Sequence, residues 1–154
     1  MATFMVHPVA RQITTQVRNT RRAPQFGHPV HQEVASGTGP CRECLQAFRV
    51  GLEDRLLFTY SPFDGGLPQP GPVFIHAEAC GPHTGVGYPD GLRGIPVVVQ
   101  WWDEGGTISA PRRLPMGDED SLLAALFDEP RVQYAHLRHA EAGCFVARVE
   151  RVAI

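Results

Sequence analysis

Alternating apolar and polar side chains predict that most of this chain is β-structure. Residues 55–60 place large apolar side chains on one face of an extended segment, and residues 30–35 alternate with the same period of two. Residues 73–77 are apolar almost throughout, which predicts a central strand buried on both of its faces. The pattern therefore predicts a sheet built of several short strands.

Turn residues between such segments predict that neighbouring strands pair antiparallel. Residues 97–102 and 107–110 flank Asp103-Glu-Gly-Gly106, whose composition is typical of a hairpin turn. Residues 132–137 and 144–152 form a second predicted pair, which is joined by a short glycine-containing turn. Both pairs favour an antiparallel sheet over a parallel one.

Two helices are predicted beside these strands. Residues 118–128 begin with acidic side chains, which the helix dipole favours, and carry an apolar stripe that ends before Pro130. A short helix is predicted after Pro40, over residues 41–48, because proline suits the first turn of a helix. The first thirty residues are ambiguous: Ala10–Thr20 fits a short helix, although threonine and valine are poor helix formers.

The fold class that follows is α+β: a single β-rich domain over residues 1–154. Its sheet is mainly antiparallel, and closure into a barrel is one option for it. A chain of 154 residues buries about 68–70% of its unfolded surface, so its core needs neither disulfides nor a metal.

The composition favours a cytoplasmic protein without nucleic-acid or membrane partners. No apolar run approaches the ~20 residues that span a bilayer, and residues 1–8 lack the features of a signal peptide. The net charge is −2, and the 14 basic residues, all arginine, are spread along the chain without a basic footprint. The absence of lysine also excludes Schiff-base enzymes, pyridoxal phosphate attachment and a P-loop lysine.

One constellation of residues carries candidate chemistry: Cys41-Arg-Glu-Cys44, followed by His76-Ala-Glu-Ala-Cys80. Zinc takes four nitrogen or sulfur ligands tetrahedrally, and a C-x2-C pair often supplies two of them. We therefore predict that Cys41, Cys44, His76 and Cys80 bind one metal ion, and zinc is the cofactor that these residue types fit.

Other interpretations of the thiols stay open. Cysteine is among the most buried residue types and fills cores as a small apolar side chain. Alternatively, Cys41 at the start of the predicted helix has a lowered pKa and is a reactive thiol. If a metal is bound, His83 and Cys144 are substitutes for the fourth ligand.

Neighbouring residues supply further candidates for binding and catalysis. Arg42 provides a fixed cationic fork for a carboxylate or phosphate, and we group it with His76 as a ligand-binding residue. Glu78 and Cys41 are the candidate catalytic residues. His-x-Glu and C-x2-C are the residue types of the zinc deaminases, but here the two halves occur in reversed order.

Four segments of the chain together resemble one known family. They are Ser36-Gly-Thr-Gly-Pro-Cys-Arg-Glu-Cys-Leu45, Leu57-Phe-Thr-Tyr-Ser-Pro-Phe63, Gly71-Pro-Val-Phe-Ile-His76 and Ala140-Glu-Ala-Gly-Cys-Phe-Val-Ala-Arg-Val149. In this order they resemble the uncharacterised bacterial family catalogued as domain of unknown function 1203, over about residues 36–154. The resemblance implies that the Pro-Cys-Arg element, with Cys41 and Arg42, is shared, whereas other residues often replace Cys44 and His76. It implies no activity, substrate or cofactor.

The function expected from the sequence is that of a small cytoplasmic binding module. Its site, around Cys41, Arg42, His76 and Cys80, would take a metal ion or a small anionic ligand. An enzyme that uses zinc-bound water or a reactive Cys41 thiol is the first alternative. A structural or protein-interaction domain is the second.

Overall fold

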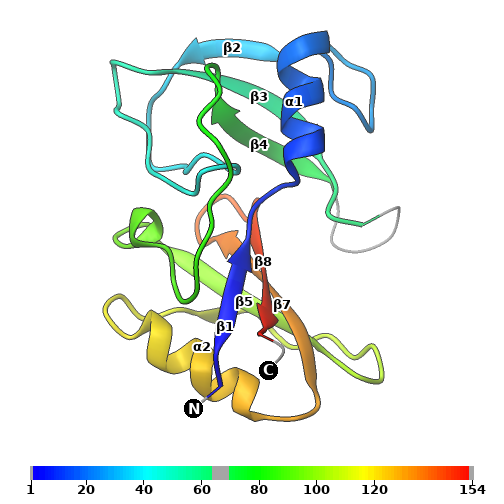
Figure 1. The fold of residues 1–154 in the computed structure, drawn as a ribbon, viewed down its shortest axis with the longest axis vertical. Helices are drawn as coiled ribbons and strands as arrows, with labels where there is room; N and C mark the ends of the chain where they lie inside the picture. Colours follow the sequence, from blue (N-terminus) through cyan, green and yellow to red (C-terminus); the bar gives the residue numbers. More distant parts are fainter. Residues whose placement is uncertain (1, 64–69, 153–154) are drawn as a thin grey trace.

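Two antiparallel sheets form the framework of the protein. The computed structural model describes residues 2–63 and 70–152. Figure 1 shows one sheet in the upper half and the other in the lower half. The upper sheet has the order β2-β3-β4, from His31–Val34, Asp54–Tyr60 and Gly71–His76. The lower sheet has the order β1-β8-β7-β5-β6, from Phe4–His7, Phe145–Arg151, Val132–His139, Val97–Asp103 and Arg112–Arg113.

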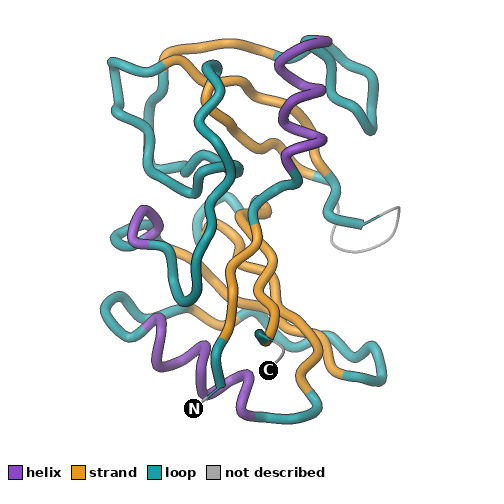
Figure 2. The backbone as a smooth tube through the Cα atoms, in the orientation of Figure 1, coloured by secondary structure: helices purple, strands orange, loops and turns teal. Residues whose placement is uncertain are grey.

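Each sheet is covered by one helix and has its own core. Helix α1 (Arg11–Thr20) contributes Val17 to the core of the upper sheet, where Phe58 and Ile75 are also buried. Helix α2 (Glu119–Asp128) packs its apolar stripe on the lower sheet. A short 3-10 helix, Asp90–Leu92, lies in the long loop that follows β4 and runs from the upper to the lower sheet (Figure 2).

The predicted α+β, mainly antiparallel fold is confirmed, and no closed barrel forms within the described part of the chain. Residues 118–128 form α2 as predicted, and the ambiguous segment Ala10–Thr20 forms α1. No described helix has both the length and the apolar character that crossing a bilayer requires.

Two strand predictions are wrong in detail. β4 is an edge strand and β3 lies at the centre of the upper sheet. Only one face of β4 is fully buried: Val73 and Ile75 lie in the upper core with Val17 of α1 and loop residues such as Phe48. Residues 107–110 make only a single bridge, Trp102 to Ile108, and the strand that pairs with β5 beyond the turn is β6.

The predicted helix over residues 41–48 is also wrong, and this correction matters for the site. Residues 41–44 form a tight turn that is closed by a bridge between Pro40 and Ala47. Leu45 has a φ of 57°, in the left-handed region that a continuing α-helix cannot use. The chain therefore reverses after Cys44.

The segment that contains this turn joins the two cores. Cys41 and Phe48 pack in the upper core, whereas Leu45 packs in the lower core. Arg42 is buried between them and donates hydrogen bonds to the carbonyls of Pro40, at 2.7 Å, and of Phe145 in β8, at 2.8 Å. The contacts of this segment therefore fix how the two sheets sit together.

Candidate metal centre

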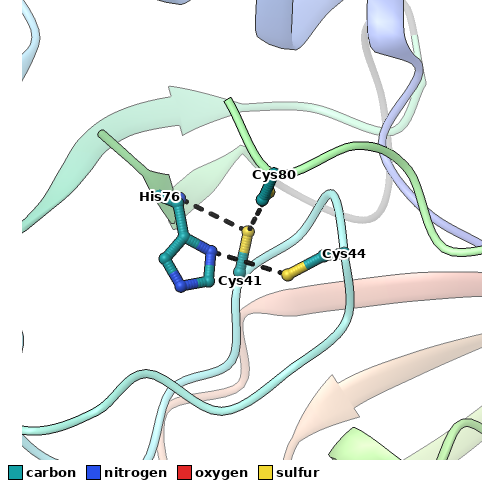
Figure 3. A group of neighbouring side chains, drawn as sticks. All are labelled: Cys41, Cys44, His76 and Cys80. Atoms are coloured by element: carbon teal, nitrogen blue, oxygen red, sulfur yellow. Dashed lines mark hydrogen bonds between the residues drawn. The ribbon is translucent and has the colours of Figure 1, made fainter. Parts of the chain in front are cut away.

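Four side chains from three parts of the fold converge beside the edge strand β4. Cys41 and Cys44 come from the turn after Pro40, His76 ends β4, and Cys80 lies in the following loop (Figure 3). One ligand atom from each lies within 4.8 Å of all the others. The structure therefore brings together the four residues that the sequence predicted as ligands.

Backbone contacts hold the turn that carries the first two thiols. The N–H of Leu45 donates to the carbonyl of Cys41, and the N–H of Cys41 donates to that of Gln46, both at 2.9 Å. A Cβ atom at Gly91 would collide with the carbonyl oxygen of Leu45, so only glycine allows this approach. The loop after β4 thus packs closely against the turn.

Two separations between ligand atoms of the cluster match the edges of a tetrahedron around zinc. Zn–S bonds of about 2.3 Å and a Zn–N bond of about 2.0 Å place two sulfurs about 3.8 Å apart and a sulfur and a nitrogen about 3.5 Å apart. The Sγ atoms of Cys41 and Cys80 are 3.7 Å apart, and Cys44 Sγ lies 3.5 Å from His76 Nδ1. No separation between ligand atoms exceeds 4.8 Å, so a contraction of about 1.3 Å or less brings every edge to the same tetrahedron.

The imidazole of His76 is held on its far side by a carboxylate. Its Nε2 lies 3.0 Å from Glu53 Oε2, while Glu53 Oε1 accepts a hydrogen bond from the N–H of Arg49 at 2.6 Å. Phe48 packs against the ring with a centroid separation of 4.5 Å. A histidine that binds a metal through one nitrogen usually donates from the other to such a carboxylate, which fixes its orientation.

A charged network that includes the buried Glu43 lies on one side of Cys80. The buried carboxylate of Glu43 accepts hydrogen bonds from the hydroxyl of Thr14, from Arg18 at 2.8 Å and from the Cys80 thiol at 3.3 Å. Arg18 also donates to Cys80 Sγ at 3.7 Å and to the carbonyl of His76 at 3.0 and 3.1 Å. Helix α1 is therefore tied directly to the residues of the cluster.

These contacts shift the pKa values of the cluster in opposite directions. Hydrogen bonds from Cys44 and Cys80 lower the pKa of Cys41. Hydrogen bonds to Cys41 and Cys44 raise the pKa of Cys80. Hydrogen bonds to Cys41 and Cys44 raise the pKa of His76 to about 10. Negative charge is therefore concentrated on Cys41, and a bound cation would replace protons on His76 and Cys80.

The other candidate residues lie around this cluster in different settings. Burial lowers the pKa of Arg42 to about 10, and its hydrogen bonds to two carbonyls give it a structural task. Anion binding by Arg42 remains a prediction. His83 and Cys144 lie outside the group of four. Glu78 lines a cavity of about 450 Å³ beside the cluster, and its catalytic role remains a prediction.

The thiols differ sharply in their access to solvent. Cys41, the predicted reactive thiol, is completely buried, whereas Cys80 is exposed. All four cysteines are free thiols. A reagent from solvent would therefore meet Cys80 before Cys41.

Sequence reasoning missed four residues of this site. Glu53, Thr14, Arg18 and Glu43 surround the cluster. Glu43 lies within the Cys41–Cys44 motif, whereas the other three have no diagnostic spacing to the thiols. The spacing of Thr14 and Arg18 by four residues would have placed both on one face once α1 was accepted as a helix. No comparable signal in the sequence indicated Glu53.

Fold and site together define a β-rich α+β domain with a Cys3His cluster of metal-binding geometry. Comparison with protein families shows where it belongs. The family described as "Protein of unknown function (DUF1203)" matches residues 38–151, and the chain belongs to this family. Comparison with curated proteins and with solved structures gave no match.

Proposed function

We propose that this protein is a small binding module in which Cys41, Cys44, His76 and Cys80 hold one structural zinc ion. The observation that carries the proposal is the convergence of their four ligand atoms within 4.8 Å. The hydrogen-bonded carboxylate behind His76 supports it, because such a partner is typical of metal-bound histidine.

The donor set favours a single zinc ion of structural type. Three thiolates and one imidazole are ligands that zinc prefers, and four protein ligands leave no position for a catalytic water. An iron–sulfur cluster would need room for bridging sulfides and several irons between the cysteines. A group of atoms within 4.8 Å of one another fits one ion better.

The role that we propose for the ion is to hold the turn after Pro40 against β4. This turn belongs to the segment that packs in both cores and through which Arg42 contacts β8. A zinc ion would therefore stabilise the mutual position of the two sheets. The free thiols fit a reducing compartment, so a cytoplasmic location belongs to the proposal as well.

The test compares Cys44→Ser with Cys144→Ser, because both positions are half-buried and only the first belongs to the cluster. Metal content and melting temperature are measured on protein purified without chelators. We expect Cys44→Ser to lower both quantities and Cys144→Ser to keep the zinc of the parent protein. Equal zinc content in the two variants, or a parent without metal, would overturn the proposal.

A further inference from the structure

We propose that the cluster is also a peroxide-responsive site, in which oxidation joins Cys80 to Cys41 and releases the metal ion. The inference rests on the proposed zinc site and names a modification that regulates it. It is carried by the unequal exposure of two thiols that lie 3.7 Å apart.

We assign the first step, attack on the peroxide, to Cys80 because its sulfur is accessible to solvent. It is exposed in the loop after β4, and a cavity of about 450 Å³ reaches it from solvent. In the zinc-loaded chain the ion would replace the proton of Cys80, so its sulfur is in the thiolate form that attacks a peroxide. Cys41 is fully buried, so it is protected from direct attack.

The second step belongs to Cys41 because it is close to Cys80. A disulfide needs an S–S distance of about 2.0 Å, so the two sulfurs must approach by about 1.7 Å. Cys80 lies outside regular secondary structure, in the loop after β4, whereas backbone hydrogen bonds hold Cys41 in its turn. We therefore expect Cys80 to make most of this movement.

The chemistry balances with a hydroperoxide as the oxidant. The Cys80 thiolate attacks one oxygen of hydrogen peroxide, the O–O bond breaks, and the departing hydroxide takes a proton to form water. The Cys41 thiolate then attacks the sulfenic sulfur of Cys80, the S–S bond forms, and the second hydroxide leaves and is protonated. Two thiolates lose two electrons, and one peroxide becomes two waters.

Loss of the metal follows from the ligand count. The disulfide removes two of the four ligands, and only Cys44 and His76 remain. Zinc sites in proteins rely on three or four protein ligands, so the ion dissociates. Reduction of the disulfide would restore the complete set and allow the ion to bind again.

The sequence makes the product easy to assign. Cleavage after arginine places the four cysteines on four separate peptides: residues 23–42, 43–49, 56–93 and 139–148. A Cys41–Cys80 disulfide therefore links 23–42 to 56–93. The alternative bond within the C-x2-C pair would link 23–42 to 43–49.

The experiment treats the zinc-loaded full chain with hydrogen peroxide, beside a chromophoric zinc chelator, and maps disulfides before reduction. We expect loss of one zinc and two thiols per chain, a 23–42 to 56–93 cross-link, and recovery of both with dithiothreitol. Cys144→Ser should give the same result. Cys80→Ser lacks one zinc ligand and is therefore compared as metal-stripped protein, where the buried Cys41 should stay reduced under the same peroxide treatment. A cross-link within the C-x2-C pair, or a Cys80 oxidised without any cross-link, would overturn the inference.

A parallel reaction separates this inference from the proposed zinc site. Protein stripped with a chelator beforehand should form the same cross-link, since the two sulfurs are already adjacent, but more slowly, because the Cys80 thiol then donates its proton to Glu43. If the parent chain takes up no zinc, the proposed zinc site is refuted, and the cross-link in the stripped protein still tests the oxidation step. If zinc binds but stays bound after the two thiols are lost, the release step fails and the zinc site stands.

Discussion

Replacing Glu53 by glutamine tests the metal centre without touching any of its ligands. Glu53 Oε2 lies 3.0 Å from His76 Nε2, and Oε1 accepts from the N–H of Arg49. Glutamine keeps the shape and an acceptor oxygen for Arg49. Its amide NH2 then faces the N–H of His76, so two donors oppose each other and the imidazole loses its fixed orientation.

The magnitude follows from what such partners contribute in known zinc sites. Loss of the carboxylate behind a metal-bound histidine typically costs 10–100-fold in affinity, or about 1.4–2.7 kcal/mol. We expect the zinc dissociation constant of Glu53→Gln to rise by roughly this factor. Because Glu53 is partly exposed and lies outside both cores, its effect on the free energy of unfolding of the metal-stripped chain should be smaller.

The assay is a competition titration against a chromophoric zinc chelator, with Glu33→Gln as the matched control. Glu33 is a carboxylate of the same sheet that pairs with Arg55, away from the cluster. Its variant should bind zinc like the parent. A Glu53→Gln affinity within twofold of the parent would refute the role of His76 as an oriented ligand.

Three further predictions follow from the structure. Zinc binding displaces at least the protons of His76 and Cys80, so the affinity should fall by at least about 100-fold for each pH unit lowered near pH 7; a pH-independent constant contradicts this. Arg42→Ala leaves two buried carbonyls without a donor and should lower the free energy of unfolding by about 3 kcal/mol or more in urea titration, against about 0.5 for exposed Arg112→Ala. Burial lowers the pKa of His136 to about 3 in the folded protein, below its unfolded value of about 6.5. The free energy of unfolding should therefore decrease as the pH falls from about 6.5 to about 3, by at most about 1.4 kcal/mol for each pH unit. His136→Phe should flatten that slope, and an unchanged slope would contradict the assignment.

The elements with strong local signals were predictable, and those decided by tertiary contacts were not. The acidic start and apolar stripe of residues 118–128 indicate a helix, and α2 forms there. After Pro40, the propensity for a helix is overridden by the left-handed conformation of Leu45, whose carbonyl packs closely against Gly91 far along the chain. That contact could not be predicted from the spacing of residues in the sequence.

The same division holds within the candidate site. The ligand types of Cys41, Cys44, His76 and Cys80 are visible in the sequence, since zinc prefers thiolates and imidazole. Glu53 faces His76 only because β3 pairs with β4 in the observed register, where Arg55 is opposite His76. A pairing register is a property of the folded sheet, so the contact of Glu53 with His76 could not be predicted from sequence motifs.

The measurement that tests the central claim most directly is X-ray absorption at the zinc edge on protein loaded with one equivalent of zinc. The Cys3His centre predicts three sulfur neighbours at about 2.3 Å and one nitrogen at about 2.0 Å. A shell made mainly of nitrogen and oxygen, or a protein that retains no zinc after gel filtration, would contradict the account.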